Sequence, residues 1–324
     1  MSNILSKIVR VGVLALVVLA PASPALAGAP HRFVVFGDSL SDPGNAFVLL
    51  RDVEVPPFQS LIPDAPYARG AFHFSNGPTW VEQLSLLDHA VPSAGPALFI
   101  PQLFSNYAVG GARARHEGPF DLSAQVGLFA RDFRGQGPSG ALYIVFVGGN
   151  DLRDALGALA VDPSGATSLA IVQAALIAIR DNLLTLHSAG ARHFLVPNAP
   201  DIGLAPAVRL LGPAAQGAAT FLAAQFNGGL ELILRGLESG LGVGIVRLDV
   251  FRTLNEIVAE PAAFGLTDVT QPCIVLNTRA HAFCPTPNKF LFWDGIHPTF
   301  AGHRILAERA NAALGAASAL AVTP

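Results

Sequence analysis

Residues 32–42 read RFVVFGDSLSD, an apolar run that ends abruptly in glycine and polar residues. Three more runs have the same form, at residues 141–147 (ALYIVFV), 193–196 (HFLV) and 243–250 (VGIVRLDV). All are rich in Val, Ile and Phe and barely alternate with polar residues, which is typical of strands covered on both faces. The sequence therefore predicts four buried strands.

Helical patterns lie between these runs. Apolar residues recur at steps of three and four over residues 169–186, and more weakly over 221–237, which indicates one buried face of a helix. A further helix is expected near residues 251–258. Strands that alternate with helices predict an α/β fold with a parallel sheet and right-handed crossovers. Ligands of such sheets bind beyond the carboxyl ends of the strands, so we examine the polar residues there.

Residues 51–100 fit this pattern less well. The stretch contains seven prolines and predicts a long irregular excursion with one helix near residues 79–87. Long ordered loops beside an α/β sheet often shape a substrate site. Five aromatic residues between positions 72 and 104 could cover such a site or pack in the core, and the sequence leaves both open. They are Phe72, Phe74, Trp80, Phe99 and Phe104.

The composition excludes several classes of protein. Of the 324 residues, 51% are hydrophobic and 13% are charged, which excludes a disordered chain. The formal net charge of −3 gives no electrostatic reason to expect a nucleic-acid partner. Oligomeric state cannot be inferred from these properties.

The first 27 residues have the form of an export signal. Lys7 and Arg10 precede an apolar run at residues 11–20, and Ala25-Leu26-Ala27 is a small-x-small cleavage site. The run is too short for a membrane span, which needs about 18 apolar residues. We therefore expect cleavage after Ala27, a secreted or periplasmic protein, and one large α/β domain over residues 28–324. Residues 169–179 are the most apolar segment that follows, and a buried core helix is expected there.

Two of the strand-end segments carry candidate catalytic residues. Ser39 directly follows the first apolar run, and at a strand-to-helix turn its hydroxyl would be exposed and its N–H would point out from a helix N-terminus. An ordinary helix-capping serine would look the same. Asp294 and His297 lie three apart on a loop that could place a carboxylate against an imidazole, as a general base requires. Taken alone, that pair could equally be a capping Asp and a surface His.

Two glycine-containing segments could stabilise an oxyanion. Residues 148–151 (GGND) follow the most apolar run, and the Asn150 amide there could donate a hydrogen bond. Residues 106–112 (NYAVGGA) offer a glycine N–H as a second donor. Plain glycine turns would explain either segment alone. The scattered histidines and the absence of His-Glu-x-x-His argue against a metal site.

Together, these segments resemble the SGNH (GDSL-type) hydrolases. FGDSLSD around Ser39, NYAVGGA, GGND, and DGIHPT at residues 294–299 are similar to four blocks of that family, in the family's order. The resemblance runs from the first strand to the last helix and points to the secreted bacterial lipases and esterases. It implies a three-layer α/β/α, flavodoxin-like fold and ester hydrolysis without a metal or organic cofactor.

The resemblance also assigns roles. It implies that Ser39 is the nucleophile, His297 the base and Asp294 its partner. The oxyanion donors would be the Ser39 N–H, the Gly111 N–H and the Asn150 amide. Gly111 is preferred to its neighbour because it falls five residues after Asn106, as in members with a single glycine.

The substrate stays open within this class. The excursion favours a lipid or aliphatic acyl ester, because such segments occur in lipolytic members of the family. The alternatives are a phospholipase or lysophospholipase with acyltransferase activity, a carbohydrate acetylesterase, and a secreted binding protein on a catalytically dead scaffold. The last would require an incomplete site, and here every expected residue is present.

The two cysteines are expected to form a disulfide. Cys273 and Cys284 lie eleven apart in a loop-like segment, and export implies an oxidising compartment. Closing so short a loop would stabilise the fold by about 3 kcal/mol. We hypothesise that this bridge braces the approach to Asp294 and His297.

Overall fold

A computed structural model describes residues 32–322 of the chain. The expected signal peptide and its cleavage site after Ala27 lie outside the described residues. The start of the expected mature domain, at residues 28–31, lies outside them as well. Cleavage and the domain boundary therefore stay predictions.

A parallel sheet of four strands forms the centre of the molecule, and its strands pair in chain order. The strands are β1 (Phe33–Gly37), β2 (Leu142–Phe146), β3 (His193–Pro197) and β4 (Gly244–Leu248). Residues 105–109 run along the free edge of β1, where the Val35 N–H donates to the Ser105 carbonyl and the Tyr107 N–H donates to the Val35 carbonyl. With this segment counted as a strand, the spatial order becomes 2-1-3-4-5, which is the flavodoxin-like order.

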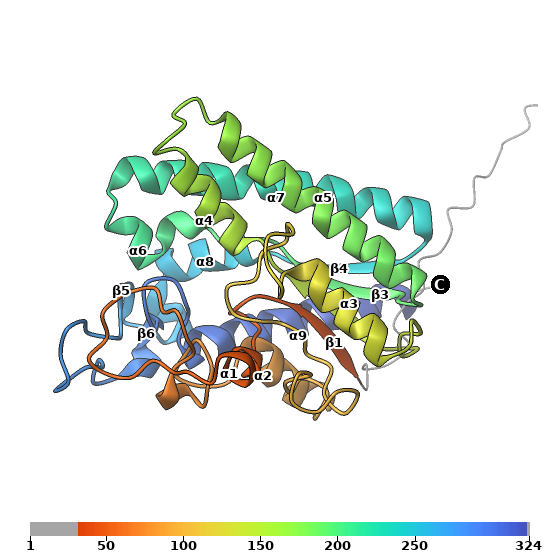
Figure 1. Ribbon diagram of the computed structural model, residues 1–324, viewed down its shortest axis with the longest axis horizontal. Helices are drawn as coiled ribbons and strands as arrows, with labels where there is room; N and C mark the ends of the chain where they lie inside the picture. Colours follow the sequence, from red (N-terminus) through yellow and green to blue (C-terminus); the bar gives the residue numbers. More distant parts are fainter. Residues whose placement is uncertain (1–31, 323–324) are drawn as a thin grey trace, which may run out of the picture.

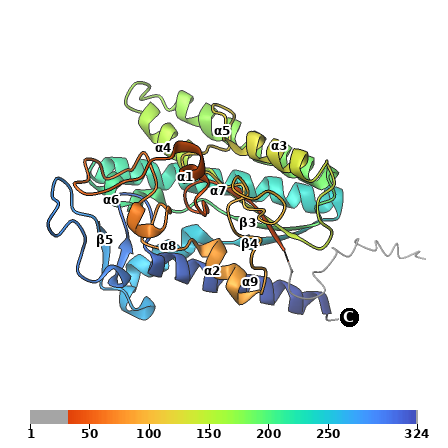
Figure 2. The same ribbon diagram turned by 60° about the horizontal axis from the view of Figure 1, so that its bottom comes forward.

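Helices cover both faces of the sheet, as Figures 1 and 2 show. One face packs against α3, α4, α5 and α7, and the other against α2 and α9. The helices are α1 (Asn45–Leu50), α2 (Trp80–Leu87), α3 (Leu122–Asp132), α4 (Gly149–Ala158), α5 (Ala166–Ser188), α6 (Pro206–Arg209), α7 (Pro213–Leu241), α8 (Val250–Ala259) and α9 (Phe300–Val322). Along β1, Val34 and Phe36 face the first layer while Phe33 and Val35 face the second. The expected three-layer α/β/α fold is confirmed.

The expected strands and helices are present, with small differences at their ends. The run at residues 243–250 was expected to be one strand, but β4 ends at Leu248 and α8 begins at Val250. The Asp249 carboxylate between them accepts a hydrogen bond from the Arg252 N–H at 3.0 Å. A side chain that caps the first turn in this way starts a helix and so ends the strand.

Among the described residues, α5 is the one helix long and apolar enough to cross a membrane by length and composition. A core helix of a soluble protein passes the same test. One face of α5, including Val172, Ile179 and Leu183, packs in the core against the sheet layer. Leu169, the first residue of the expected buried pattern, is instead about half exposed, as is Ile177. The expected core helix is therefore present, with one side open to the surface.

The excursion packs against a small second sheet. The two strands of this sheet are β5 (Asp268–Pro272) and β6 (Phe290–Phe292). The expected disulfide between Cys273 and Cys284 is present in the loop that joins them. The Cys273 N–H donates to the Phe292 carbonyl, and the Ile274 N–H donates to the Trp293 carbonyl. The bridged loop is thus bonded to the residues that directly precede Asp294, as the bracing hypothesis requires.

Candidate active site

Ser39, His297 and Asp294 form one chain of hydrogen bonds. The Oγ atom of Ser39 lies 2.8 Å from His297 Nε2, and His297 Nδ1 lies 2.7 Å from Asp294 Oδ2. The other oxygen of Asp294 accepts the backbone N–H groups of Ile296 and His297 at 2.9 and 2.8 Å. An Asp carboxylate can only accept, so His297 donates from Nδ1 and leaves Nε2 to accept the Ser39 proton. This is the arrangement of a serine activated by an oriented imidazole.

The turn that carries Ser39 differs from the expected one. Ser39 was expected at a helix N-terminus, but it lies in a turn closed by the Ser41 N–H and the Asp38 carbonyl, and α1 begins only at residue 45. The reason is the buried carboxylate of Asp42, which accepts the N–H groups of Gly44, Asn45 and Ala46. These bonds start the helix after Asp42, and the helix-dipole argument for Ser39 is therefore wrong.

The structure distinguishes the two candidate glycines. The Gly110 N–H donates to Asp42 Oδ2 at 2.8 Å, so it has a partner already. The Gly111 N–H has no hydrogen-bond partner among the described residues, and Gly111 has a positive φ of 81°. A left-handed backbone at this point turns the next peptide sharply, which glycine tolerates. The geometry supports Gly111 as the oxyanion donor.

Asn150 lies beside the Gly111 loop. It is in the first turn of α4, and its Nδ2 donates to the Ala112 carbonyl at 2.9 Å. That bond uses one of the two amide hydrogens and fixes the plane of the amide, so the second N–H can donate to a ligand. Two of the three expected oxyanion donors, Ser39 and Asn150, line the same cavity as His297.

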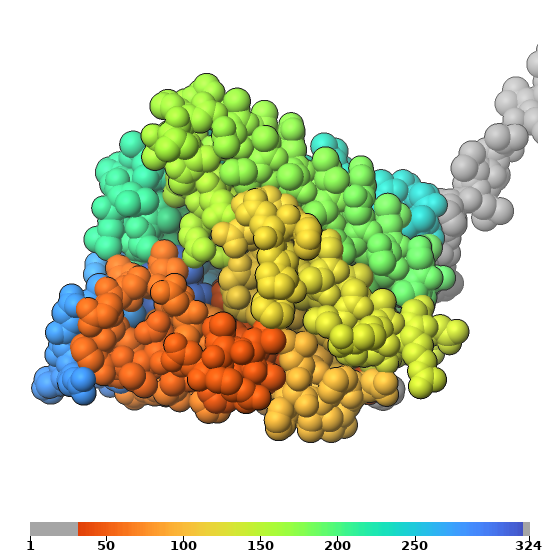
Figure 3. Space-filling view, in the orientation of Figure 1, coloured from red at the N-terminus to blue at the C-terminus, as the bar shows by residue number. Residues whose placement is uncertain are grey.

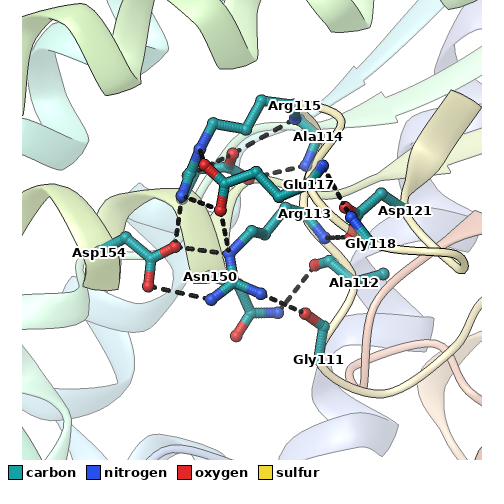
Figure 4. A network of polar contacts seen from close by, with 11 residues as sticks. Gly111, Ala112, Arg113, Ala114, Arg115, Glu117, Gly118, Asp121, Asn150 and Asp154 are labelled. Atoms are coloured by element: carbon teal, nitrogen blue, oxygen red, sulfur yellow. Dashed lines mark hydrogen bonds and ion pairs between the residues drawn. The ribbon is translucent and has the colours of Figure 1, made fainter.

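Acidic side chains hold the Gly111 loop in place (Figure 4). Downstream of the loop, the Asp151 carboxylate accepts the Ala114 N–H at 2.8 Å and pairs with the Arg115 guanidinium. Asp154, one turn later on α4, pairs with Arg113 and Arg115. Upstream of the loop, the Asp42 carboxylate accepts the hydrogen bond from the Gly110 N–H. The donor loop is thus fixed on both sides by carboxylates.

Tyr67 is a member of the site that the sequence did not reveal. Its hydroxyl donates to Asp294 Oδ2 at 2.9 Å, the same oxygen that His297 contacts. The ring is buried and packs edge-on against Trp293 and Phe58. Burial and the neighbouring Asp294 carboxylate raise the pKa of Tyr67 far above its usual range, so the hydroxyl stays a donor. Tyr67 comes from the irregular excursion, where nothing in the local pattern marks it.

We expect Tyr67→Phe to change the pH dependence of catalysis. Without the Tyr67 donor, Asp294 carries more unshared negative charge and holds the protonated imidazole more strongly. The acid limb of the kcat/KM profile should then move to higher pH by up to about one to two units, because a hydrogen bond to a charged group is worth about 1.5–3 kcal/mol. The measurement is kcat/KM for one ester across the pH range.

Tyr107→Phe provides a matched control. The Tyr107 hydroxyl is also buried and also donates to a carboxylate, Asp132 Oδ2 at 3.1 Å, but it does not contact the site. That variant should lose similar stability and keep the wild-type pH profile. If both variants keep it, Tyr67 has a structural role only.

Asp38 is a second buried carboxyl beside the nucleophile. Burial is the main cause that raises the pKa of Asp38 to about 6, while the hydrogen bond from the Leu40 N–H and the nearby His297 act in the opposite direction. Its side chain lines the same cavity as Ser39. Its carboxyl therefore gains or loses charge near pH 6 at the wall of the site.

The cavity at Ser39 has a volume of about 270 Å³. In Figure 3, a hollow opens between the orange excursion and the yellow-green atoms of α4, with blue C-terminal residues inside it. The five aromatic residues that could have covered the site do not line this cavity. Trp80 is in the core, Phe72 stacks on Phe47, and only Phe74 approaches the site, with its ring 5.4 Å from that of His297. Residues from α4, α8 and the link between β3 and α7 line the cavity instead.

Among residues 32–322, no group of three or more His, Cys, Asp or Glu side chains is arranged to hold a metal ion.

A family model described as GDSL-like Lipase/Acylhydrolase matches residues 33–310, which is most of the chain. The chain belongs to the GDSL-like lipase/acylhydrolase family. This family comprises GDSL esterases and lipases, which are carboxylic ester hydrolases. The match begins at β1 and ends within α9, and it includes all four blocks that resemble the SGNH hydrolases.

Named GDSL esterases/lipases of Arabidopsis thaliana are similar to this chain. GDSL esterase/lipase At5g55050 is 26% identical over 90% of this chain and 88% of its own length. GDSL esterase/lipase At5g22810 is 31% identical, but the match covers only 38% of each protein. Both relatives are plant proteins, so placement among bacterial members stays a prediction. Among solved structures, an acetylxylan esterase from Geobacillus stearothermophilus is similar, at 16% identity and a TM-score of 0.47 over 89% of this chain and 95% of that one.

Proposed function

We propose that this GDSL hydrolase cleaves esters of aliphatic acids through an acyl-enzyme on Ser39. The observation that carries the proposal is the continuous hydrogen-bonded path from Ser39 Oγ through His297 to Asp294, at the mouth of an apolar cavity. A binding protein on a dead scaffold would not need this path.

The reaction follows from the positions of these groups. His297 Nε2 accepts the Ser39 proton as the Ser39 oxygen attacks the ester carbonyl. The oxyanion that forms is stabilised by the N–H groups of Ser39 and Gly111 and by the Asn150 amide. His297 then protonates the leaving alcohol, and an acyl-enzyme remains. Water, activated by the same imidazole, releases the acid.

We also propose that the protein is exported, after cleavage of the signal peptide at Ala27. The Cys273–Cys284 disulfide supports this proposal, because such bonds persist in oxidising compartments. Whether the destination is the periplasm or the medium is left to fractionation of cells that express the full chain. Retention of the uncleaved chain inside the cell would contradict the proposal.

A panel of esters tests the proposed substrate class. The purified protein should hydrolyse p-nitrophenyl esters of longer aliphatic acids with kcat/KM at least about tenfold above that for p-nitrophenyl acetate, because burial of each methylene in an apolar site adds about fourfold. It should release little acetate from an acetylated xylo-oligosaccharide. Phosphatidylcholine with an added alcohol should release little fatty acid and form little transfer product.

Other outcomes of the panel would identify the alternatives. Preference for the acetylated sugar would indicate a carbohydrate acetylesterase. Fatty acid released from phosphatidylcholine, or passed to the added alcohol, would indicate a phospholipase with acyltransferase activity. No Ser39-dependent hydrolysis of any ester would contradict the proposed function as a whole.

A further inference from the structure

A second cavity adjoins the cavity at Ser39. We call the cavity at Ser39, of about 270 Å³, the outer cavity, and its neighbour, of about 80 Å³, the inner cavity. The same five residues line both cavities, so the cavities adjoin along them, and we call these residues the wall. The members of this wall are Leu40, Pro200, Leu254, Phe292 and Ile296.

The inner cavity is suited to hydrocarbon. Apolar side chains such as Ile257, Leu291 and Leu306 line most of it. Thr253 also lines it, but the Thr253 hydroxyl already donates to the Asp249 carbonyl at 2.7 Å. A space lined mostly by apolar groups binds hydrocarbon more favourably than water. The inner cavity therefore suits a hydrocarbon chain.

We propose that the outer cavity holds the acyl chain of the substrate and that Leu254, in the wall, sets the longest chain that fits. This inference rests on the proposed function and specifies its substrate: an ester with a single unbranched acyl chain of short to medium length. The volume of the outer cavity is at the lower end of the roughly 300–1,000 Å³ typical of ligand sites. A chain that fills it ends against the wall.

The chemistry of the site assigns the cavity to the acyl side of the ester. After the first step the alcohol must leave and water must approach His297 Nε2, so that side needs access to solvent. The acyl group stays bound to Ser39 through both steps and gains from contact with an apolar surface. Ser39 and Asn150, which would hold the reacting carbonyl, both line the outer cavity.

Leu254 is the wall residue best placed for a test. Leu40 and Ile296 adjoin Ser39 and His297 in the chain, and changes there would disturb the catalytic residues. Leu254 lies instead on α8, is partly buried, and packs with the cluster that includes Ile257 and Phe292. Its replacement can therefore change the wall while leaving the catalytic bonds in place.

The experiment compares two ester series in wild type and Leu254→Ala. One series varies the acyl chain with p-nitrophenol as a fixed leaving group, and the other varies the alcohol with a fixed acetyl group. In Leu254→Ala the two cavities join, and the preferred acyl chain should become longer. Each methylene that enters the inner space should add about fourfold to kcat/KM, so the ratio of long-chain to short-chain kcat/KM should rise at least about tenfold. The alcohol series should keep its wild-type profile.

Three further variants separate this role from general loss of packing. Val258→Ala removes apolar volume from the same helix and the same cluster but lines neither cavity, so it should keep the wild-type chain-length profile. Leu254→Val should shift the profile in the same direction by less, which keeps the test usable if the alanine variant folds poorly. The double variant Leu254→Ala/Ile257→Phe should restore the shorter preference, because Ile257 lines only the inner cavity.

The outcomes are distinguishable from those for the proposed function. If Ser39-dependent hydrolysis occurs but neither Leu254 variant changes the acyl series, the wall does not set chain length. A shift in the alcohol series alone would assign the cavity to the leaving group and overturn the inference. Absence of Ser39-dependent hydrolysis in wild type would instead contradict the proposed function.

Discussion

Ser39→Ala should reduce kcat for ester hydrolysis by on the order of 10⁶-fold, to near the background rate, as is found when a serine nucleophile is removed. The reason is that His297 would then have no hydroxyl at 2.8 Å from which to take a proton, and no acyl-enzyme could form. The measurement is the rate with a p-nitrophenyl ester at high enzyme concentration. Purification in parallel with the wild type limits contamination by host esterases.

A second measurement makes this test independent of background activity. A fluorophosphonate should add its phosphonyl group to wild type at one site, and mass spectrometry should place the adduct on the peptide that contains Ser39. Ser188→Ala, an exposed change at the end of α5, should keep both the activity and the adduct. Near-wild-type turnover by folded Ser39→Ala, or an adduct on another residue, would remove the central assignment.

Asn150→Ala should reduce kcat by about 10²–10³-fold with little change in KM. The amide would donate to the oxyanion, which exists only in the transition state and the intermediate, so its loss should affect the rate more than substrate binding. Asn150→Asp retains the shape of the side chain but places a carboxylate at the oxyanion, and it should be at least as impaired.

Asn182→Ala is the matched control for the loss of a buried amide. Asn182 lies on α5, and its Nδ2 donates to Ser123 Oγ and to the Ala178 carbonyl, away from the site. Both alanine variants lose an amide that pairs with buried groups, and both should be less stable to urea. Only the Asn150 variants should lose turnover. Equal activity in the Asn150 and Asn182 variants would exclude the oxyanion role.

Much of the fold and the catalytic constellation could be predicted from the sequence, because both depend on local patterns. Buried strands produce continuous apolar runs, and the residues after such runs must lie at one edge of a parallel sheet. Ser39 after β1 and Asn150 after β2 therefore had to be neighbours. In the spatial order 2-1-3-4-5, the direction of the chain order reverses between β1 and β2. Ligands of open α/β sheets bind at such a reversal, and Ser39 and Asn150 lie there.

The other parts of the site depend on long-range packing and could not be predicted. Tyr67 lies 227 residues before Asp294, in a proline-rich segment without periodicity, so no local pattern places its hydroxyl against that carboxylate. The cavity wall combines residues from β6, α8 and the β3–α7 link, and their meeting depends on how these elements pack. The sequence shows which aromatic residues the excursion contains but not where their side chains lie. It therefore leaves open whether they cover the site or pack in the core.

The turn at Ser39 shows how a local rule can mislead. A serine after a strand commonly begins a helix, but the carboxylate of Asp42 binds three later N–H groups and delays the helix. The sequence contained this signal, since an Asp before Pro43-Gly44 is typical of a turn. The delayed helix leaves the Ser39 N–H without a partner in the described part of the chain, which suits an oxyanion donor.

The bond between Ser39 and His297 joins residues 258 positions apart. A ribosome must add 258 residues after Ser39 to reach His297, and α9, which follows His297, still has to pack against α2 and β4. The unfinished chain therefore lacks its catalytic pair however well its earlier parts have folded. The order of synthesis thus keeps the growing chain without ester hydrolase activity until His297 has been added.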